Sequence, residues 1–307
     1  MNYYNKNTII YLNGEYVNAS EAGMDLYSQS LHYGYAVFEG IRSYKTVSGE
    51  TKIFKAKEHY ERLKNSATLL NIPYPFDRDE IIDITYQVLE KNGIQDAYIR
   101  PLVYLPADMT FNVSQESYLM IAAWPMGLFL GDKLLRVATS QYQRPNPKGF
   151  IIEAKASGHY VNSILASQDA KQRGYNEALL TDMNGWVAEG PGANVFFEKE
   201  GRLFTPATGN ILPGITRQTV LELCEALQIE VEEGQFTVED MKEADAAFFC
   251  GTAAEIIGWE SLDDIFFKKP WSETLSKKIQ NAYKDLVIEK EQEPAPESRQ
   301  LDAALSS

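Results

Sequence analysis

Two residues with complementary chemistry, Lys155 and Glu189, are separated by thirty-four positions in the sequence. Lys155 lies in the stretch EAKASGHYVNSILA, and Glu189 lies in the acidic turn AEGPGANVFF. A lysine amine can form a Schiff base with the aldehyde of pyridoxal phosphate, and a carboxylate can keep the pyridine nitrogen protonated, so that the ring withdraws electrons from a substrate. The residues around the lysine, Ala154 to Gly158, are small, and we expect them to leave room for a flat cofactor against the backbone. The pair therefore indicates the two ends of a pyridoxal phosphate site.

Three further segments offer groups that suit a phosphate. LPGITRQ places Gly214, Ile215 and Thr216 at the start of a predicted helix, where free backbone amides and the helix dipole attract anions. Thr252 in CGTAAE adds a hydroxyl beside a glycine, and Arg62 in EHYERL adds a permanent charge with planar donors. Each segment taken singly is explained better without a ligand, as a capped helix, a turn after a strand or a solvated surface arginine.

The elements that must position these groups fall into two sets along the chain. The first set comprises strands at 8–12 and 15–19, helices at 56–70 and 77–93, and strands at 96–106 and 116–125. Asn13 and Gly14 join the first two strands, and this dipeptide is preferred in tight hairpin turns. Apolar residues recur at helical spacing in the second helix, and Gly93 follows as a stop signal. These patterns predict an α+β unit that closes near Pro125.

A second set of elements follows the connection MGLFLGDKL. It comprises helices at 160–174, 214–227 and 237–244 and strands at 177–182, 185–190, 194–206 and 246–250, the third folding back through Lys199 to Gly201. Thr237 and Asp240 form a capping pattern at the start of the last helix. We therefore predict a small domain at 1–125, a connection at 126–136, a large cofactor-binding domain at 137–288 and a disordered tail, rich in Glu and Pro, at 289–307.

The composition restricts the possible partners. A net charge of −14 argues against broad binding to nucleic acid or to anionic membranes, because those surfaces attract clustered Lys and Arg. Cys224 and Cys250 have no metal or redox spacing, and three histidines are too few for a histidine-rich metal site. The first residues lack the order of a secretion signal, and no apolar run is long enough to span a membrane. We expect a cytoplasmic protein with reduced thiols, no bound metal and small-molecule substrates.

Several stretches, taken together and in order, carry a family resemblance. They are LHYGYAVFEGIRSY, EHYERL, AYIRPL, EAKASGHYVNSILAS, AEGPGANVFF, LPGITR and GTAAEI. With them the chain resembles the branched-chain amino acid aminotransferases, within the fold type IV pyridoxal phosphate enzymes, from YLNGEYV to about Leu286. The resemblance implies an α+β fold, in which a smaller N-terminal α/β domain precedes a larger C-terminal domain with a mixed, barrel-like sheet and helices.

The resemblance also implies roles for individual residues. Lys155 is the catalytic Schiff-base lysine, Glu189 the partner of the pyridine nitrogen and Tyr160 the neighbour of the phenolic oxygen of the cofactor. The residues expected to hold the phosphate are Arg62, Ile215, Thr216 and Thr252, and those expected to surround the substrate are Tyr33, Phe38, Arg42, Tyr98, Arg100, Thr252 and Ala253. The aromatic rings suit a branched apolar side chain, and the two arginines suit the distal carboxylate of glutamate.

The implied activity is transamination of leucine, isoleucine and valine with 2-oxoglutarate, which gives branched 2-oxo acids and L-glutamate in ping-pong order. Lys155 is expected to move the proton of the substrate Cα. The resemblance further implies a homodimer or a higher homo-oligomer with the site near its interface.

Alternatives within the same fold are D-amino acid aminotransferases, R-selective amine transaminases and aminodeoxychorismate lyase. The D-amino acid enzymes usually carry Arg-x-His where this chain has Arg100, Pro101 and Leu102, which weakens that alternative. A non-catalytic cofactor-binding protein is an alternative of another class. A protein of that kind would not need the lysine, the pyridine partner and all the phosphate-binding groups together, so their joint presence argues against this alternative.

The chain departs from the family pattern at three places. Ala193 stands where relatives often have a glutamate, and Met126 and Phe129 stand where they often have Trp and Tyr. The segment Met109 to Val113 differs from the usual glycine-rich loop. These departures concern the breadth of substrates, so the ranking of amino donors stays open.

Overall fold

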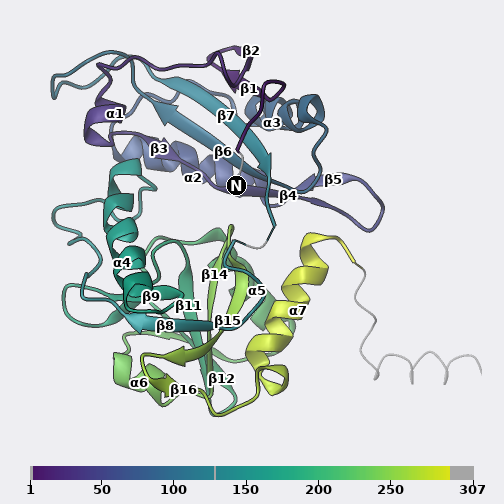
Figure 1. Ribbon diagram of the computed structural model, residues 1–307, viewed down its shortest axis with the longest axis vertical. Coiled ribbons are helices and arrows are strands. Elements are labelled where there is room, and N and C mark those ends of the chain that lie inside the picture. Colours follow the sequence, from purple (N-terminus) through teal and green to yellow (C-terminus); the bar gives the residue numbers. More distant parts are fainter. Residues whose placement is uncertain (1–2, 128, 291–307) are drawn as a thin grey trace, which may run out of the picture.

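Two sheets follow one another along the chain in the computed structural model, which describes residues 3–127 and 129–290 (Figure 1). The first sheet contains β1 (Ile9–Leu12), β2 (Glu15–Asn18), β3 (Val37–Phe38), β4 (Ile41–Lys45), β5 (Thr51–Ile53), β6 (Ala97–Tyr104) and β7 (Tyr118–Pro125). Its strands are antiparallel in the order β2-β1-β7-β6-β4-β5, and β3 pairs with β6. The predicted hairpin is confirmed, with Asn13 at φ 49° and Gly14 at φ 97°, as a primed turn requires.

Helices cover one face of the first sheet. They are α2 (Ala56–Leu69) and α3 (Arg78–Asn92), while the short α1 (Gln29–Tyr33) precedes β3. The side chain of Asp77 accepts from the first amides of α3, and Gly93 ends that helix in the left-handed conformation, as its predicted stop signal requires. Leu63 and Val88 pack with Ile99 and other buried residues of β6 and β7.

The alternation of side chains along β6 sets the position of the site. Ile99 and Val103 point into the core under the helices, so Tyr98 and Arg100 lie on the opposite face. Trp124 of β7 pairs directly with Tyr98 and therefore shares its face. The first sheet thus presents aromatic and basic side chains toward the second sheet.

The second sheet is mixed and follows the connection at residues 126–134. Its strands are β8 (Leu135–Thr139), β9 (Glu177–Thr181), β10 (Val187–Glu189), β11 (Asn194–Lys199), β12 (Arg202–Pro206), β13 (Val231–Gly234), β14 (Ala246–Gly251), β15 (Glu255–Leu262) and β16 (Ile265–Phe266). The order is β10-β9-β8-β15-β14-β11-β12-β13, and β16 pairs with β15. The pairs β8–β9, β8–β15 and β12–β13 are parallel, and the others are antiparallel.

The remaining helices pack around this sheet (Figure 1). They are α4 (Tyr160–Gln172), α5 (Ile215–Ala226), α6 (Val238–Lys242) and α7 (Leu275–Val287), with short 3-10 turns η1 (Ser157–His159) and η2 (Trp271–Glu273). Ala166 and Ala170 of α4 contact the equally small Ala138 and Ala178, so this helix lies close to β8 and β9. The capping box predicted at Thr237 and Asp240 is present at α6.

Most predicted helices and strands are confirmed to within a few residues at their ends. The elements that were not predicted are the helices α1 and α7 and the strands β3, β4, β5, β13, β15 and β16. The predicted tail lies, from residue 291 onward, outside the described residues, and the division into domains stays a prediction. Among the helices of residues 3–127 and 129–290, none combines the length and the apolar character needed to cross a bilayer.

Candidate active site

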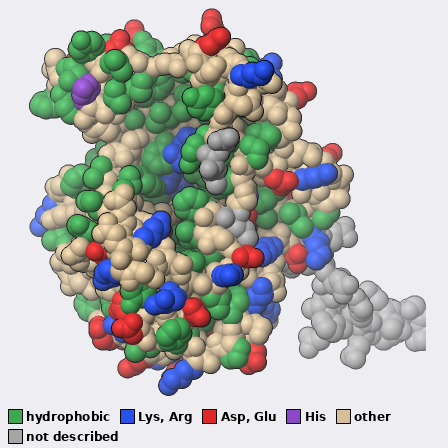
Figure 2. Space-filling view, viewed as in Figure 1, with side chains coloured by type: hydrophobic (Ala, Val, Ile, Leu, Met, Phe, Trp, Pro, Cys, Tyr) green, Lys and Arg blue, Asp and Glu red, His purple; other side chains and the backbone are tan. Residues whose placement is uncertain are grey.

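A cavity of about 510 Å³ lies between the two sheets. Its volume is in the ordinary range for small-molecule sites, roughly 300–1,000 Å³. Figure 2 shows the surface hollowed between the upper and lower parts of the molecule, with hydrophobic and basic side chains in the hollow. The predicted residues that line the cavity are Phe38, Arg62, Tyr98, Arg100, Lys155, Tyr160, Glu189, Ile215, Thr216, Thr252 and Ala253.

Lys155 is held where the segment before α4 crosses the segment before β4. The backbone amide of Phe38 donates to the carbonyl of Lys155 at 3.1 Å, and the amide of Gly158 donates to the carbonyl of Gly34 at 2.9 Å. A Cβ on Gly34, which has φ 65°, would lie 2.7 Å from the Cα of Gly158. Small residues after Lys155 were expected to make room for a cofactor, but Gly158 instead permits this close crossing of the two chain segments.

The amine of Lys155 points at a phenol. Its Nζ lies 2.7 Å from the hydroxyl of Tyr160 and 5.1 Å from the centre of the Phe38 ring. The two rings meet edge to face with centroids 4.9 Å apart. Because these three groups come from β3, from the segment before η1 and from the start of α4, both sheets contribute to the reactive end of the cavity.

Glu189 forms a buried polar cluster at another wall of the cavity. Its Oε1 lies 2.9 Å from Nε of Arg144 and accepts the amide of Leu212 at 3.1 Å, while Oε2 accepts Nδ2 of Asn194 at 2.9 Å. The geometry of the Arg144 contact is that of an ion pair, not of an aligned hydrogen bond. Burial raises the pKa of Glu189 above its ordinary value, although Arg144 opposes this effect.

A third part of the cavity suits an anion. Helix α5 begins after Gly214. In the part of the chain that the structure describes, no side chain caps the first amides of this helix. A Cβ on Gly214 would come within 1.9 Å of Oδ1 of Asn194, so only glycine fits at this helix start. Thr216 of the helix and Thr252 of the facing turn both line the same space. Free amides at a helix N-terminus form a ready site for a phosphate.

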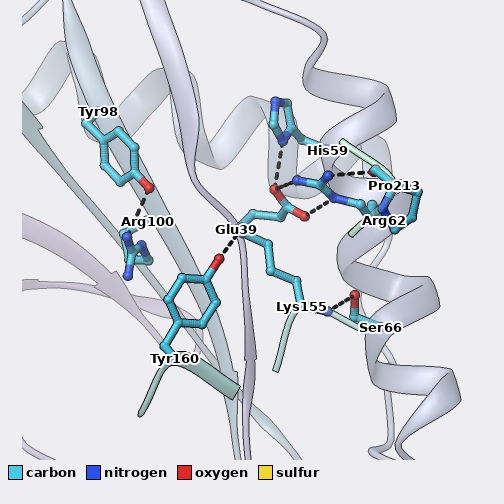
Figure 3. A network of polar contacts seen from close by, with 9 residues as sticks. All are labelled: Glu39, His59, Arg62, Ser66, Tyr98, Arg100, Lys155, Tyr160 and Pro213. Carbon is cyan, nitrogen blue, oxygen red and sulfur yellow. Dashed lines mark hydrogen bonds and ion pairs between the residues drawn. The ribbon is translucent and has the colours of Figure 1, made fainter. Parts of the chain in front are cut away.

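Arg62 reaches the anion end from α2 of the first sheet (Figure 3). Its Nη1 donates to the carbonyl of Pro213 at 3.0 Å, and its Nε and Nη2 donate to the carboxylate of Glu39 at 2.7 and 2.9 Å. Nδ1 of His59 lies 2.7 Å from the same carboxylate. Burial alone would raise the pKa of Glu39, but Arg62 and His59 hold it well below its ordinary value.

Arg100 lies in the aromatic part of the cavity without an acidic partner in the described chain. Its Nη2 donates to the hydroxyl of Tyr98 at 2.9 Å, and its guanidinium lies 4.4 Å from the centre of the Phe38 ring. Its Nε is buried and lacks a hydrogen-bond partner among the described residues. Trp124 packs on Tyr98 with centroids 5.1 Å apart. This arrangement provides a free cation among apolar walls.

Two predicted residues are not part of this cavity. The guanidinium of Arg42 donates to the carbonyls of Met126 at 2.8 Å and Gly127 at 3.3 Å, and it lies 3.4 Å from the carboxylate of Glu255. Arg42 therefore binds the connection between the sheets and does not line this cavity. The side chain of Tyr33 is half exposed on the outside of the molecule, where its ring packs against that of Phe111 with centroids 5.5 Å apart.

Other residues of the site were missed by the sequence analysis. Arg144 and Asn194 contact Glu189, whereas Glu39 contacts Arg62 and His59 contacts Glu39. Asn194 stood in the stretch AEGPGANVFF, so its spacing from Glu189 was an available signal. Of the positions at which the chain departs from the family pattern, Ala193, Met126 and Phe129 line the cavity, whereas Met109 to Val113 do not.

The comparisons with known proteins agree with this geometry. A model of the family described as class IV amino-transferases matches residues 36–262. The chain belongs to the class IV aminotransferases. As such it has the mixed α+β architecture of fold type IV, which confirms the predicted fold class.

Among relatives of this aminotransferase, a branched-chain-amino-acid aminotransferase of Pseudomonas aeruginosa is 37% identical over 285 residues, which are 91% of this chain and 92% of the relative. The crystal structure of a branched-chain aminotransferase from Thermoproteus uzoniensis with norvaline has a TM-score of 0.89 at 35% identity, covering 93% of this chain and 96% of that one. The crystal structure of the branched-chain amino acid aminotransferase of Thermobaculum terrenum in its PLP form has a TM-score of 0.87 at 34% identity. The match covers 94% of this chain and 96% of that one.

Proposed function

We propose that this aminotransferase uses pyridoxal phosphate to transfer the amine of branched-chain L-amino acids to 2-oxoglutarate. The products are branched 2-oxo acids and L-glutamate, formed in ping-pong order. The observation that carries this proposal is the amine of Lys155, 2.7 Å from the Tyr160 hydroxyl, in the same cavity as Glu189 and the uncapped start of α5. The named activity of the relatives supports the choice of branched-chain substrates.

The residues present fit pyridoxal phosphate. The uncapped amides of α5, with Arg62, Thr216 and Thr252, suit the phosphate. A primary amine at Lys155 suits the aldehyde, and the buried carboxylate of Glu189 suits the pyridine nitrogen. We propose that these residues hold the cofactor, together with Ile215 and with Tyr160 at the phenolic oxygen.

When bound, pyridoxal phosphate supplies a ring that accepts the negative charge which develops at the substrate Cα. Lys155 acts as the base that takes the Cα proton and later returns a proton on the cofactor side. The hydroxyl of Tyr160 fixes the position of the amine, and the Phe38 ring excludes water beside it. Glu189, held by Arg144 and Asn194, keeps a proton on the pyridine nitrogen.

The substrate end of the cavity offers both an apolar wall and a cation. Phe38 and Tyr98, with Trp124 beside them, suit the branched side chain of leucine. Arg100 has no acidic partner among the described residues, so it can pair with the distal carboxylate of glutamate when that substrate occupies the same space. Thr252 and Ala253, in the turn after β14, complete the wall on the side of the second sheet.

An exposed apolar patch supports the proposal of a homodimer. The patch combines residues of α1 and its approach, of the loop after β6 and of one side of α4: Leu26, Tyr27, Leu31, Tyr33, Phe111, Val113, Val161, Ile164 and Leu165. Single exposed apolar residues are normal in proteins, but many large apolar side chains exposed on a few elements indicate an interaction site. A second copy of this chain is the partner that the family resemblance implies, and Tyr33 would then lie at the interface.

We also propose a cytoplasmic location, which the composition leads us to expect.

Half-reactions with a panel of amines test the proposed function. The purified holoprotein is mixed with L-leucine, L-valine, L-glutamate, D-leucine or an R-amine without an acceptor, and the loss of absorbance of the bound pyridoxal form is followed. We expect rapid loss with the three L-amino acids only. A response to D-leucine or the R-amine in place of L-leucine would show one of the alternative transaminases, and no response to any amine would show a non-catalytic protein.

A further inference from the structure

We propose that Glu39 is a positioning residue, which holds the guanidinium of Arg62 in the orientation needed for the phosphate of the cofactor, with His59 as its support. This inference rests on the proposed function, because it concerns how the chain recognises pyridoxal phosphate. Neither Glu39 nor His59 lines the cavity, so both act through Arg62.

Two residues, Arg62 and His59, hold the carboxylate of Glu39 (Figure 3). Glu39 lies in the turn between β3 and β4 and is fully buried, at 0% exposure. Oε1 accepts Nε of Arg62 at 2.7 Å, while Oε2 accepts Nη2 of Arg62 at 2.9 Å and lies 2.7 Å from Nδ1 of His59. A bidentate contact of this kind fixes the plane of the guanidinium as well as its position.

The contacts of Arg62 leave a defined part of it for a ligand. A guanidinium has five N–H donors. Two are given to Glu39 and one to the carbonyl of Pro213, at 3.0 Å, so two remain beside the start of α5. Glu39 belongs to the first sheet and Pro213 to the segment before α5 of the second. Arg62 therefore contacts both the first sheet and the segment before α5, next to the proposed phosphate site.

When Glu39 is neutralised, the loss of its charge and the loss of its orienting contacts should change the affinity for pyridoxal phosphate in opposite directions. Burial lowers the pKa of His59, even though Glu39 opposes this, so His59 is neutral and donates its Nδ1 proton. The group of Glu39, His59 and Arg62 then has no net charge. Removal of the carboxylate would add a net positive charge beside the phosphate, which by Coulomb attraction alone would strengthen binding. Loss of orientation would weaken it, because the two free donors would no longer be fixed.

The chain contains a matched control for the loss of a buried carboxylate. Glu198 is also fully buried, and it lies 2.6 Å from Nζ of Lys269 and accepts the amide of Ser276 at 3.0 Å. It does not line the cavity. Glu198→Gln therefore removes another fully buried carboxylate from an ion pair, one whose lysine is partly exposed, without touching Arg62.

The test compares pyridoxal phosphate with pyridoxal, which lacks the phosphate. Dissociation constants of both are measured by equilibrium dialysis on the full-length apoprotein of the parent, Glu39→Gln and Glu198→Gln. We expect Glu39→Gln to lose about tenfold or more in affinity for pyridoxal phosphate, as for the loss of a hydrogen bond to a charged group, with unchanged affinity for pyridoxal. The ratio of the two affinities should stay at the parent value in Glu198→Gln. An unchanged ratio or tighter binding of pyridoxal phosphate in Glu39→Gln would overturn the inference.

His59 supplies a second pair of variants, which decides the question if Glu39→Gln does not fold. His59→Leu removes a donor from Glu39 and should lower the same ratio of affinities. His59→Asn should restore it, because its amide can place a donor near the position of Nδ1. Equal ratios in both variants and the parent would overturn the inference. Failure of the parent itself to bind pyridoxal phosphate would instead contradict the proposed function.

Discussion

The amine of Lys155 lies 2.7 Å from the hydroxyl of Tyr160, and both Lys155 and Tyr160 contact the ring of Phe38. Tyr160 is the first residue of α4, whereas the backbone of Lys155 is bound to the segment that leads into β4. The relative placement of amine and phenol thus depends on how the two sheets meet, and not on their spacing in sequence alone.

Glu189→Gln tests the electronic part of the account. The substitution keeps the size of the side chain but removes the charge that keeps the pyridine nitrogen protonated. We expect a marked fall in the rate at which the Cα proton of L-leucine exchanges with deuterated solvent, with little change in the affinity for leucine. Exchange at the parent rate would show that Glu189 is not the partner of the ring. Glu198→Gln, which alters a fully buried carboxylate outside the cavity, serves as the control.

Arg100→Met tests how one pocket accepts both leucine and glutamate. Because Arg100 is the proposed partner of the distal carboxylate, its loss should slow the half-reaction with glutamate by about 2 kcal/mol or more, roughly 30-fold, relative to that with leucine. Equal losses would place Arg100 at the shared α-carboxylate or in a structural role. Arg42→Met should impair both substrates equally, since Arg42 binds Met126, Gly127 and Glu255.

The stability of the apoprotein should report the ionised state of Glu39. Its partners lower its pKa in the folded state, so as the pH falls the unfolded chain takes up the proton first and the stabilisation is lost. We expect the difference in free energy of unfolding between the parent and Glu39→Gln to be constant near neutral pH. Below about pH 4.3 it should shrink, by up to about 1.4 kcal/mol per pH unit. A difference that stays constant or grows down to about pH 3 would be inconsistent with a lowered pKa.

Local signals explain which elements the sequence predicts. Asn13 with Gly14 and the caps of α3 at Asp77 and Gly93 act within a few residues, so they are visible in the sequence. The strands β3 and β5 have only two and three residues, too few to show a period. The central position of β15, between β8 and β14, depends on pairing with β8, which lies far earlier in the chain, and no local pattern encodes this pairing.

The same distinction applies to the site. Motif residues such as Lys155 and Thr216 were predicted, because the family resemblance carries them together. Arg144 was missed, since its role depends on an ion pair with Glu189, which the fold alone brings within 2.9 Å. Arg42 was expected at the substrate because of its motif, but carbonyls of the connection and the distant Glu255 hold its guanidinium elsewhere. Tertiary contacts therefore decide which charged side chains of a motif face the ligand.

The most direct test of the account follows nitrogen from one substrate to the other. The holoprotein is incubated with 15N-labelled L-leucine and 2-oxoglutarate, and 15N in L-glutamate is measured by mass spectrometry, in the parent, in Lys155→Ala and in the surface control Lys199→Ala. We expect labelled glutamate from the parent and the control but none from Lys155→Ala, whose thermal unfolding should resemble that of the parent. Labelled glutamate from Lys155→Ala at the parent rate, or none from the parent, would contradict the central claim.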